Sequence, residues 1–158
     1  MMYILVNATE NNIELIKDIK LEMIFSSPDE FREEDVDKIK EYVDISVKEF
    51  LKDYKLVIIN DSIAGIFFVR DFEDGVLIDE IYLYDEYRNK GIGTKLLIEA
   101  MKYLNTTKPF ITISESKLSM FNSFINKYKW EASEIVNNIY NHKEYCFNGY
   151  ITKKNYTK

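Results

Sequence analysis

The strongest constraint on the fold is a change in hydrophobic spacing after the first third of the chain. Before it, apolar residues recur every three or four positions over 13–23 and 36–51, which is typical of amphipathic helices. After it come three extended apolar runs, at 56–59, 63–69 and 76–84, with short polar connections. Such connections between neighbouring runs predict antiparallel hairpins.

The remaining segments complete a mixed α/β order. The expected strands are 3–6, 110–113, 130–136 and 144–152, and the expected further helices are 91–104 and 118–128. This order indicates an α/β or α+β sheet with helices packed on it. At 158 residues we expect a single domain, spanning 1–158.

Composition and charge narrow the function classes. Hydrophobic residues make up 46% of the chain, which is enough for a packed core. The net charge of −6 argues against a nucleic-acid partner, because phosphate binding needs a basic face. Residues 1–100 carry 12 basic and 23 acidic side chains, which would suit a cationic partner or would simply solvate helix faces.

Cysteine and histidine are too few for two common kinds of site. Cys146 is the single cysteine and His142 the single histidine, so we expect no internal disulfide and no metal cluster. Cys146 lies in an aromatic run and is expected to pack inside a strand. The N-terminal apolar run lacks a basic flank and is too short for a signal peptide or membrane span. We expect a cytoplasmic protein with no membrane partner.

A basic turn with two of the five glycines joins the third extended run to the next helix. It reads Arg88-Asn89-Lys90-Gly91-Ile92-Gly93-Thr94. Glycines let ligand oxygens approach the backbone, and the first amides of a helix are unpaired and favour anions. The P-loop spacing is absent, and Leu96 stands where the dinucleotide fingerprint needs its third glycine. We therefore expect a pyrophosphate held mainly by backbone.

The pattern R-x-x-G-x-G at 88–93 resembles the acyl-CoA pyrophosphate loop of the GNAT superfamily of N-acetyltransferases, and 82–87 resembles its strand-four stretch. The element order is similar over nearly the whole chain. The resemblance implies a mixed, mostly antiparallel sheet of about seven strands flanked by four helices, with acetyl-CoA as acyl donor and no metal. The implied CoA-binding residues are Leu83 and Tyr84 for the pantetheine, Arg88, Asn89, Lys90, Gly91, Ile92, Gly93 and Thr94 for the pyrophosphate, and Asn122.

Two carboxylates in the third extended run are candidate bases. An alkyl amine is mostly protonated at neutral pH, so its attack on a thioester needs a route for proton loss. Asp79 and Glu80 stand in an otherwise apolar run and alternate between the two faces, so at least one should be partly desolvated. Relatives often carry an acid on this strand, and we take Glu80 as the base with Asp79 second. An ion-paired or solvent-facing acid is the alternative for each.

The departing CoA thiolate needs a proton from a donor or from solvent. Many relatives use a tyrosine on the last helix, but Ile125 occupies that place here and Lys129 replaces a following glycine. Tyr128, three residues after Ile125, is the substitute donor, with a core aromatic as the alternative. Asn122 lies a few residues later than the asparagine of relatives.

The connection between the first two expected helices bears on the acceptor. The connection at 28–37 carries six acids and one base, which would attract a cationic amine or would simply start a helix. The resemblance implies an N-acetyltransferase acting on a primary amine in a ternary complex. An acyl-CoA-binding regulatory module and a structural domain without cofactor are the alternatives. The oligomeric state, including a homodimer, is left open.

Overall fold

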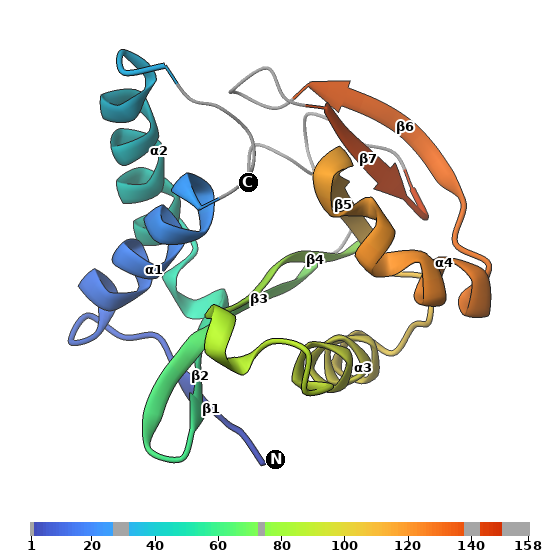
Figure 1. Ribbon diagram of the computed structural model, residues 1–158, viewed down its shortest axis with the longest axis horizontal. Coiled ribbons are helices and arrows are strands. Elements are labelled where there is room, and N and C mark those ends of the chain that lie inside the picture. The colour runs from blue at the N-terminus through green and yellow to red at the C-terminus, as the bar shows by residue number, and fades with distance from the viewer. Residues whose placement is uncertain (1, 27–31, 73–74, 138–142, 150–158) are drawn as a thin grey trace. The chain divides into compact units, whose positions relative to one another are not determined.

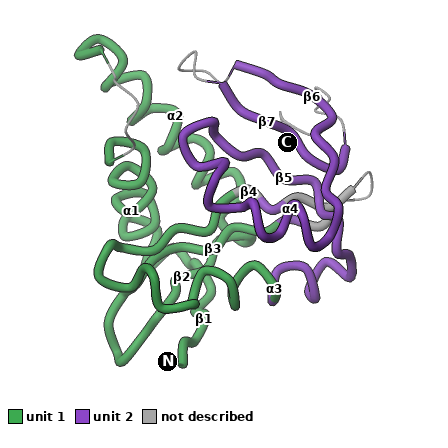
Figure 2. Tube along the Cα trace, turned by 45° about the vertical axis from the view of Figure 1, so that its right-hand side comes forward, with its two compact units in different colours: residues 1–69, 80–98 green, residues 70–79, 99–158 purple. Residues whose placement is uncertain are grey.

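The computed structural model describes residues 2–26, 32–72, 75–137 and 143–149. The chain divides into two compact units, Met1–Val69 with Glu80–Ile98 and Arg70–Asp79 with Glu99–Lys158 (Figure 2). Strands β3 and β4 and helix α3 each run from one unit into the other. Each unit is considered by itself below.

The first unit is built on hydrogen-bonded strands (Figure 1). Strand β1 (Ile4–Asn7) pairs antiparallel with β2 (Tyr54–Ile59), and β2 pairs antiparallel with β3 (Ser62–Phe72). Asn60 and Asp61 join β2 to β3 with φ of 50° and 63°, the left-handed pair that a two-residue hairpin requires. The end of β4 (Gly75–Leu83) follows β3 in the strand order.

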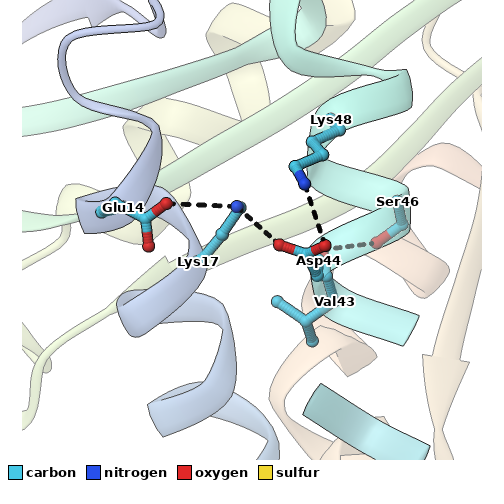
Figure 3. Close-up of polar contacts among 6 residues, drawn as sticks. All are labelled: Glu14, Lys17, Val43, Asp44, Ser46 and Lys48. Carbon is cyan, nitrogen blue, oxygen red and sulfur yellow. Dashed lines mark hydrogen bonds and ion pairs between the residues drawn. The ribbon is translucent and has the colours of Figure 1, made fainter. Parts of the chain in front are cut away.

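Helices α1 (Ile13–Phe25) and α2 (Asp35–Glu49) lie side by side in this unit and are tied by charge. Lys17 Nζ lies 2.6 Å from Asp44 Oδ1 and 3.2 Å from Glu14 Oε1, and Lys48 Nζ lies 3.1 Å from Asp44 Oδ2 (Figure 3). The Lys17 hydrogen bond lowers the pKa of Asp44, and the same bond raises the pKa of Lys17. This network links the apolar faces of two helices that carry Ile16, Ile39 and Val43 into the core.

The second unit contains the start of β4, the end of α3 (Ile92–Leu104) and three further strands. Strand β5 (Phe110–Ser114) runs parallel to β4 at Leu77↔Phe110 and Ile78↔Ile111. Strand β7 (Lys143–Phe147) pairs antiparallel with both β5 and β6 (Ala132–Asn137). A 3-10 segment (Glu115–Phe121) leads into α4 (Asn122–Tyr128).

The mixed α/β class is confirmed, and the described residues form one strand order, β1-β2-β3-β4-β5-β7-β6. Four differences in the boundaries have a clear local cause. The helix expected over 118–128 is a 3-10 segment as far as Phe121, which fits the three-residue spacing of Leu118, Phe121 and Phe124. The strand expected from residue 130 begins at Ala132, because the Trp130 amide still bonds to Ile125 at the end of α4.

The other two differences concern the second helix and the last strand. Helix α2 ends at Glu49 instead of 51, because Phe50 leaves the helical region with φ −113° and ψ 24°, and a 3-10 turn (Leu51–Asp53) follows. Strand β7 ends at Phe147, where Asn148 turns to φ 66°; residues 150–152 of the expected strand lie outside the described residues. Among the described helices, none combines the length and hydrophobicity that a membrane span requires.

Candidate functional site

The turn between β4 and α3 lies wholly in the first unit. After Leu83 come a 3-10 turn (Asp85–Tyr87) and the residues Arg88 to Gly91, and α3 begins at Ile92. Asn89 and Gly91 have φ of 60° and 79°, and these two left-handed positions reverse the chain into the helix. The Lys95 amide donates to Gly91 O at 3.2 Å, so the amides before it open the helix without an intrahelical acceptor.

The glycines of this turn face open space. Apart from its chain neighbours and the adjoining helix backbone, a Cβ built on Gly91 or on Gly93 meets no heavy atom within 4 Å. The positive φ explains glycine at position 91, but Gly93 has no such φ and lies in the first turn of α3. Protein packing therefore gives no reason for glycine at Gly93, whereas a ligand lying against the amides would give one.

Arg88 is tied to the end of its own strand. Its Nε donates to Leu83 O at 2.8 Å, its Nη1 lies 2.8 Å from Asp85 Oδ1, and its guanidinium carbon lies 5.1 Å from the centre of the Tyr82 ring. These three contacts hold the turn in its reversed shape. Arg88 thus stabilises the turn through contacts within the protein. The contact expected between Arg88 and CoA stays a prediction.

The backbone near the strand end is also engaged. The Tyr84 amide donates to Ala64 O at 2.8 Å, and Tyr84 O accepts from the Tyr87 amide at 2.9 Å. Gly65 lies against β4 so closely that a Cβ there would stand 1.8 Å from Tyr82 O. Gly65 is thus a positioning residue that the sequence analysis missed. The pantetheine contacts expected at Leu83 and Tyr84 stay predictions.

Glu80 is held by a buried cation from α1. Its Oε1 lies 2.6 Å from Lys20 Nζ, and the two side chains are 10% and 4% exposed. Lys20 Nζ also donates to the Tyr54 hydroxyl at 2.6 Å and lies 5.3 Å from the centre of that ring. Among the described residues, Glu80 Oε2 is the buried side-chain oxygen that has no hydrogen-bond partner. Glu80 is thus ion-paired through Oε1, and its Oε2 has no partner among the described residues; its expected role as the base stays a prediction.

Lys20 was missed by the sequence analysis, although a signal was present. It stands in the apolar stripe of α1, four residues after Ile16 and next to Ile19, both of which are buried. A lysine inside such a stripe is rarely buried unless it is paired. Its position therefore pointed to a buried carboxylate elsewhere in the chain.

Tyr84, the residue directly after β4, adds a second link to α1. Burial raises the pKa of its hydroxyl, and the hydrogen bond and negative charge of Glu22 act in the same direction. Its ring meets that of Tyr82 edge to face, with centroids 5.9 Å apart. Tyr84 consequently stays a neutral phenol over the physiological pH range.

Several expected site residues are described only in part. The side chain of Asp79 lies outside the described residues, although its backbone is in β4, and the acidic residues 29 and 30 lie outside them entirely. In the described part of the acidic connection, Arg32 pairs with Glu34 at 2.9 Å and with Asp35 at 3.1 Å. The hydrogen bond from Arg32 lowers the pKa of the Asp35 carboxyl. Part of the expected acidic surface is thus neutralised locally.

The remaining candidates belong to the second unit. Tyr128 is half-buried at the end of α4 and stacks on Phe124 with ring centroids 6.1 Å apart. Asn122 is exposed at the first position of α4. Lys129 ends the helix in the left-handed region, with φ 55° and ψ 46°, a conformation that glycine adopts more readily than lysine. The roles of Tyr128 and Asn122 stay predictions.

Cys146 is fully buried in β7. Burial raises the pKa of its thiol to about 12, and the nearby carboxylates of Glu134 and Glu144 act in the same direction. The packing role expected from the sequence agrees with this position. A thiol that stays protonated at neutral pH is a poor nucleophile.

The open glycine turn at the start of α3 follows directly on a strand of a mixed sheet, an arrangement that suits an anion. Residues 18–113, more than half of the chain, match the model of the acetyltransferase (GNAT) family. The chain belongs to the GNAT acetyltransferase family. No curated protein matches it.

Solved structures share the fold at low sequence identity. A GNAT family acetyltransferase from Bacillus cereus is 22% identical, with a TM-score of 0.57 over 93% of this chain and 96% of its own. Arabidopsis thaliana Naa50, in complex with the bisubstrate analogue CoA-Ac-MVNAL, is 20% identical, with a TM-score of 0.61 over 96% and 100%. The PaiA N-acetyltransferase from Thermoplasma acidophilum, in complex with coenzyme A, is 16% identical, with a TM-score of 0.63 over 94% and 100%.

Proposed function

We propose that the protein transfers the acetyl group of acetyl-CoA to a primary amine of a small molecule or peptide, by direct attack in a ternary complex. The observation that carries the proposal is the open turn at the start of α3, where glycine at Gly93 has no packing reason. Membership of the GNAT family and two related folds with CoA-containing ligands support acetyl-CoA as the donor.

The pyrophosphate of CoA would lie against the first amides of α3. The amides of Ile92, Gly93 and Thr94 point out of the helix start, where the helix dipole favours negative charge. Lys90 and Thr94 are exposed beside them and would add an ammonium and a hydroxyl. The backbone of Leu83 and Tyr84 would hold the pantetheine, with Arg88 and Asn89 shaping the turn.

The amine would lose its proton to Glu80. The amine nitrogen attacks the thioester carbonyl carbon, the carbon–sulfur bond breaks, and the surplus proton passes to Glu80 Oε2 directly or through one water. That oxygen is buried and has no partner among the described residues, which supports Glu80 as the base. The CoA thiolate would take its proton from solvent or from Tyr128. The high pKa of Cys146, about 12, supports a route without a covalent enzyme intermediate.

Calorimetry with CoA tests the turn. Gly93→Ala should raise the free energy of unfolding by about 0.5–1 kcal/mol, because alanine is the better helix former and its methyl group meets open space. The same methyl group should weaken CoA binding at least tenfold by blocking the amides. Lys102→Ala, at an exposed position near the other end of α3, is the matched control and should leave the affinity unchanged. Unchanged affinity in folded Gly93→Ala would contradict the assignment.

The second candidate is an acyl-CoA-binding regulatory module without turnover. Ile125 in place of the usual tyrosine favours it. A thiol-release assay over polyamines, amino acids, aminoglycosides and peptides separates the two functions. Under the proposed function, Glu80→Gln should lose most turnover while CoA affinity is retained. Loss in Asp79→Asn instead would move the base to Asp79.

A further inference from the structure

We propose that Lys20 is a positioning and specificity-determining residue. It occupies one oxygen of Glu80, leaves the other to the acceptor amine, and selects amines that arrive unprotonated. This inference rests on the proposed function and names its substrate class, an α-amine of an amino acid or peptide instead of a lysine side chain or polyamine. Every residue that carries it lies in the first unit.

The position of the Lys20 ammonium is fixed from several sides. Its Nζ lies 2.6 Å from both Glu80 Oε1 and the Tyr54 hydroxyl. The rings of Tyr42 and Phe68 lie 5.6 and 5.9 Å from it, measured to their centres. With a side chain 4% exposed, this ammonium has neither the space nor the water to swing away. Lys20 therefore occupies Glu80 Oε1 in the structure.

The second oxygen of Glu80 needs a hydrogen-bond donor that the described part of the chain does not supply. Oε2 is buried without a partner on a carboxylate side chain that is 10% exposed. A buried carboxylate oxygen without a donor is costly, and native structures rarely keep one without a reason. A donor from a ligand, either an amine N–H or a bridging water, would complete the carboxylate.

The charge at this carboxylate decides which amine is accepted. Lys20 already balances the negative charge of Glu80, so a substrate ammonium at Oε2 would be a second cation on one carboxylate. Two like charges sharing a poorly hydrated group repel strongly. A neutral amine or a water donates to Oε2 without adding charge. The Lys20–Glu80 ion pair thus favours binding of the deprotonated amine at Glu80 Oε2.

This selection separates two classes of biological amine. An α-amine has a pKa near 8 and a lysine ε-amine a pKa near 10.4, so at neutral pH the unprotonated fraction of the α-amine is roughly two-hundredfold larger. The greater intrinsic nucleophilicity of the ε-amine offsets part of this advantage. We therefore expect kcat/KM at least about tenfold higher for the α-amine.

Two peptides of identical length, each containing one lysine, provide the test with the full chain and acetyl-CoA. One has a free N-terminus and an acetylated lysine side chain; the other has an acetylated N-terminus and a free lysine side chain. Thiol release at pH 7 should give the tenfold preference for the free N-terminus. An equal or better reaction of the free lysine, or release from neither peptide by a protein that binds acetyl-CoA, overturns the inference and leaves CoA binding intact. Failure to bind acetyl-CoA overturns the proposed function as well.

Variants at the pair test the role of Lys20 itself. Folded Lys20→Met should narrow the preference between the two peptides at least threefold, a ratio that a merely structural role would not move. If that variant does not fold, Tyr54→Phe is the second test, because it removes one partner of the ammonium and keeps the ring. It should lower kcat severalfold for the N-terminal peptide with the KM for acetyl-CoA unchanged. A folded variant of either kind with wild-type values contradicts the role.

Discussion

The buried pair of Lys20 and Glu80 should dominate the stability of the first unit, and a double-mutant cycle can measure it. The cycle consists of Lys20→Met, Glu80→Met and the double variant. Methionine has a similar length and volume and suits the aromatic surroundings of Lys20, so the substitutions mainly remove charge.

The magnitude follows from the burial of the two side chains. With 4% and 10% exposure, removing either partner leaves an uncompensated charge out of water, at a cost of about 3–5 kcal/mol in the free energy of unfolding. For a chain of this size that cost corresponds to a fall in Tm of roughly 10 °C. The double variant removes both charges, so we expect its stability to return to within about 2 kcal/mol of the wild type.

Urea unfolding followed by far-UV circular dichroism is the suitable assay, because α1 and α2 contribute to that signal. Fluorescence of Trp130 reports the second unit and would show whether the two units unfold together. Lys48→Met is the matched control, since Lys48 is exposed where it meets Asp44 and should change stability little. A loss below about 1 kcal/mol in both single variants, or a double variant that costs their sum, would refute the reasoning.

Three further predictions concern other parts of the chain. Lys129→Gly should raise the free energy of unfolding by about 0.5–1 kcal/mol, because Lys129 holds φ 55°; lower stability in urea unfolding would contradict this. Cys146 should resist alkylation by iodoacetamide at pH 8 in the native protein and react only after denaturation, because its pKa is about 12; rapid native labelling would contradict its burial. Because the pKa of Asp44 is lowered, its ionised form stabilises the fold above the unfolded pKa of 3.8, and this stabilisation is lost as pH falls through the folded pKa. Because the pKa of Lys17 is raised, its charged form stabilises the fold below the unfolded pKa of 10.5, and this stabilisation is lost as pH rises through the folded pKa. Asp44→Asn should therefore weaken the pH dependence of the free energy of unfolding at both the acidic and the alkaline end. An unchanged pH dependence would show that the network contributes nothing.

Local features of the fold were predictable from the sequence because they depend on neighbouring residues. The hairpin at Asn60 and Asp61, the helix over α3 and the turn before it each follow from spacing and from residues that tolerate a left-handed backbone. Boundaries were less predictable where two helical forms fit one spacing, as in the 3-10 segment before Asn122. The resemblance of the turn at 88–93 to the acyl-CoA loop of the GNAT superfamily then predicted the family.

Contacts between distant elements were not predictable in the same way. Nothing in the turn sequence shows that Arg88 donates to Leu83 O, because that bond depends on how the strand end and the 3-10 turn fold back on each other. Gly65 is likewise ordinary in sequence, and only the approach of Tyr82 O explains it. Such constraints arise from the packing of backbones, which residue spacing does not encode.

The pairing of Lys20 with Glu80 lies between these two cases. Each residue interrupts an apolar pattern, Lys20 in α1 and Glu80 in β4, and each interruption alone predicts a buried charge. Because buried charges occur in pairs of opposite sign, two such interruptions of opposite sign in one small unit predict each other. The rule cannot say that one oxygen of Glu80 is left without a donor, since that depends on the approach geometry of a single ammonium. The charge balance of the site could thus be inferred from the sequence, whereas the vacant oxygen on which the chemistry depends required the structure.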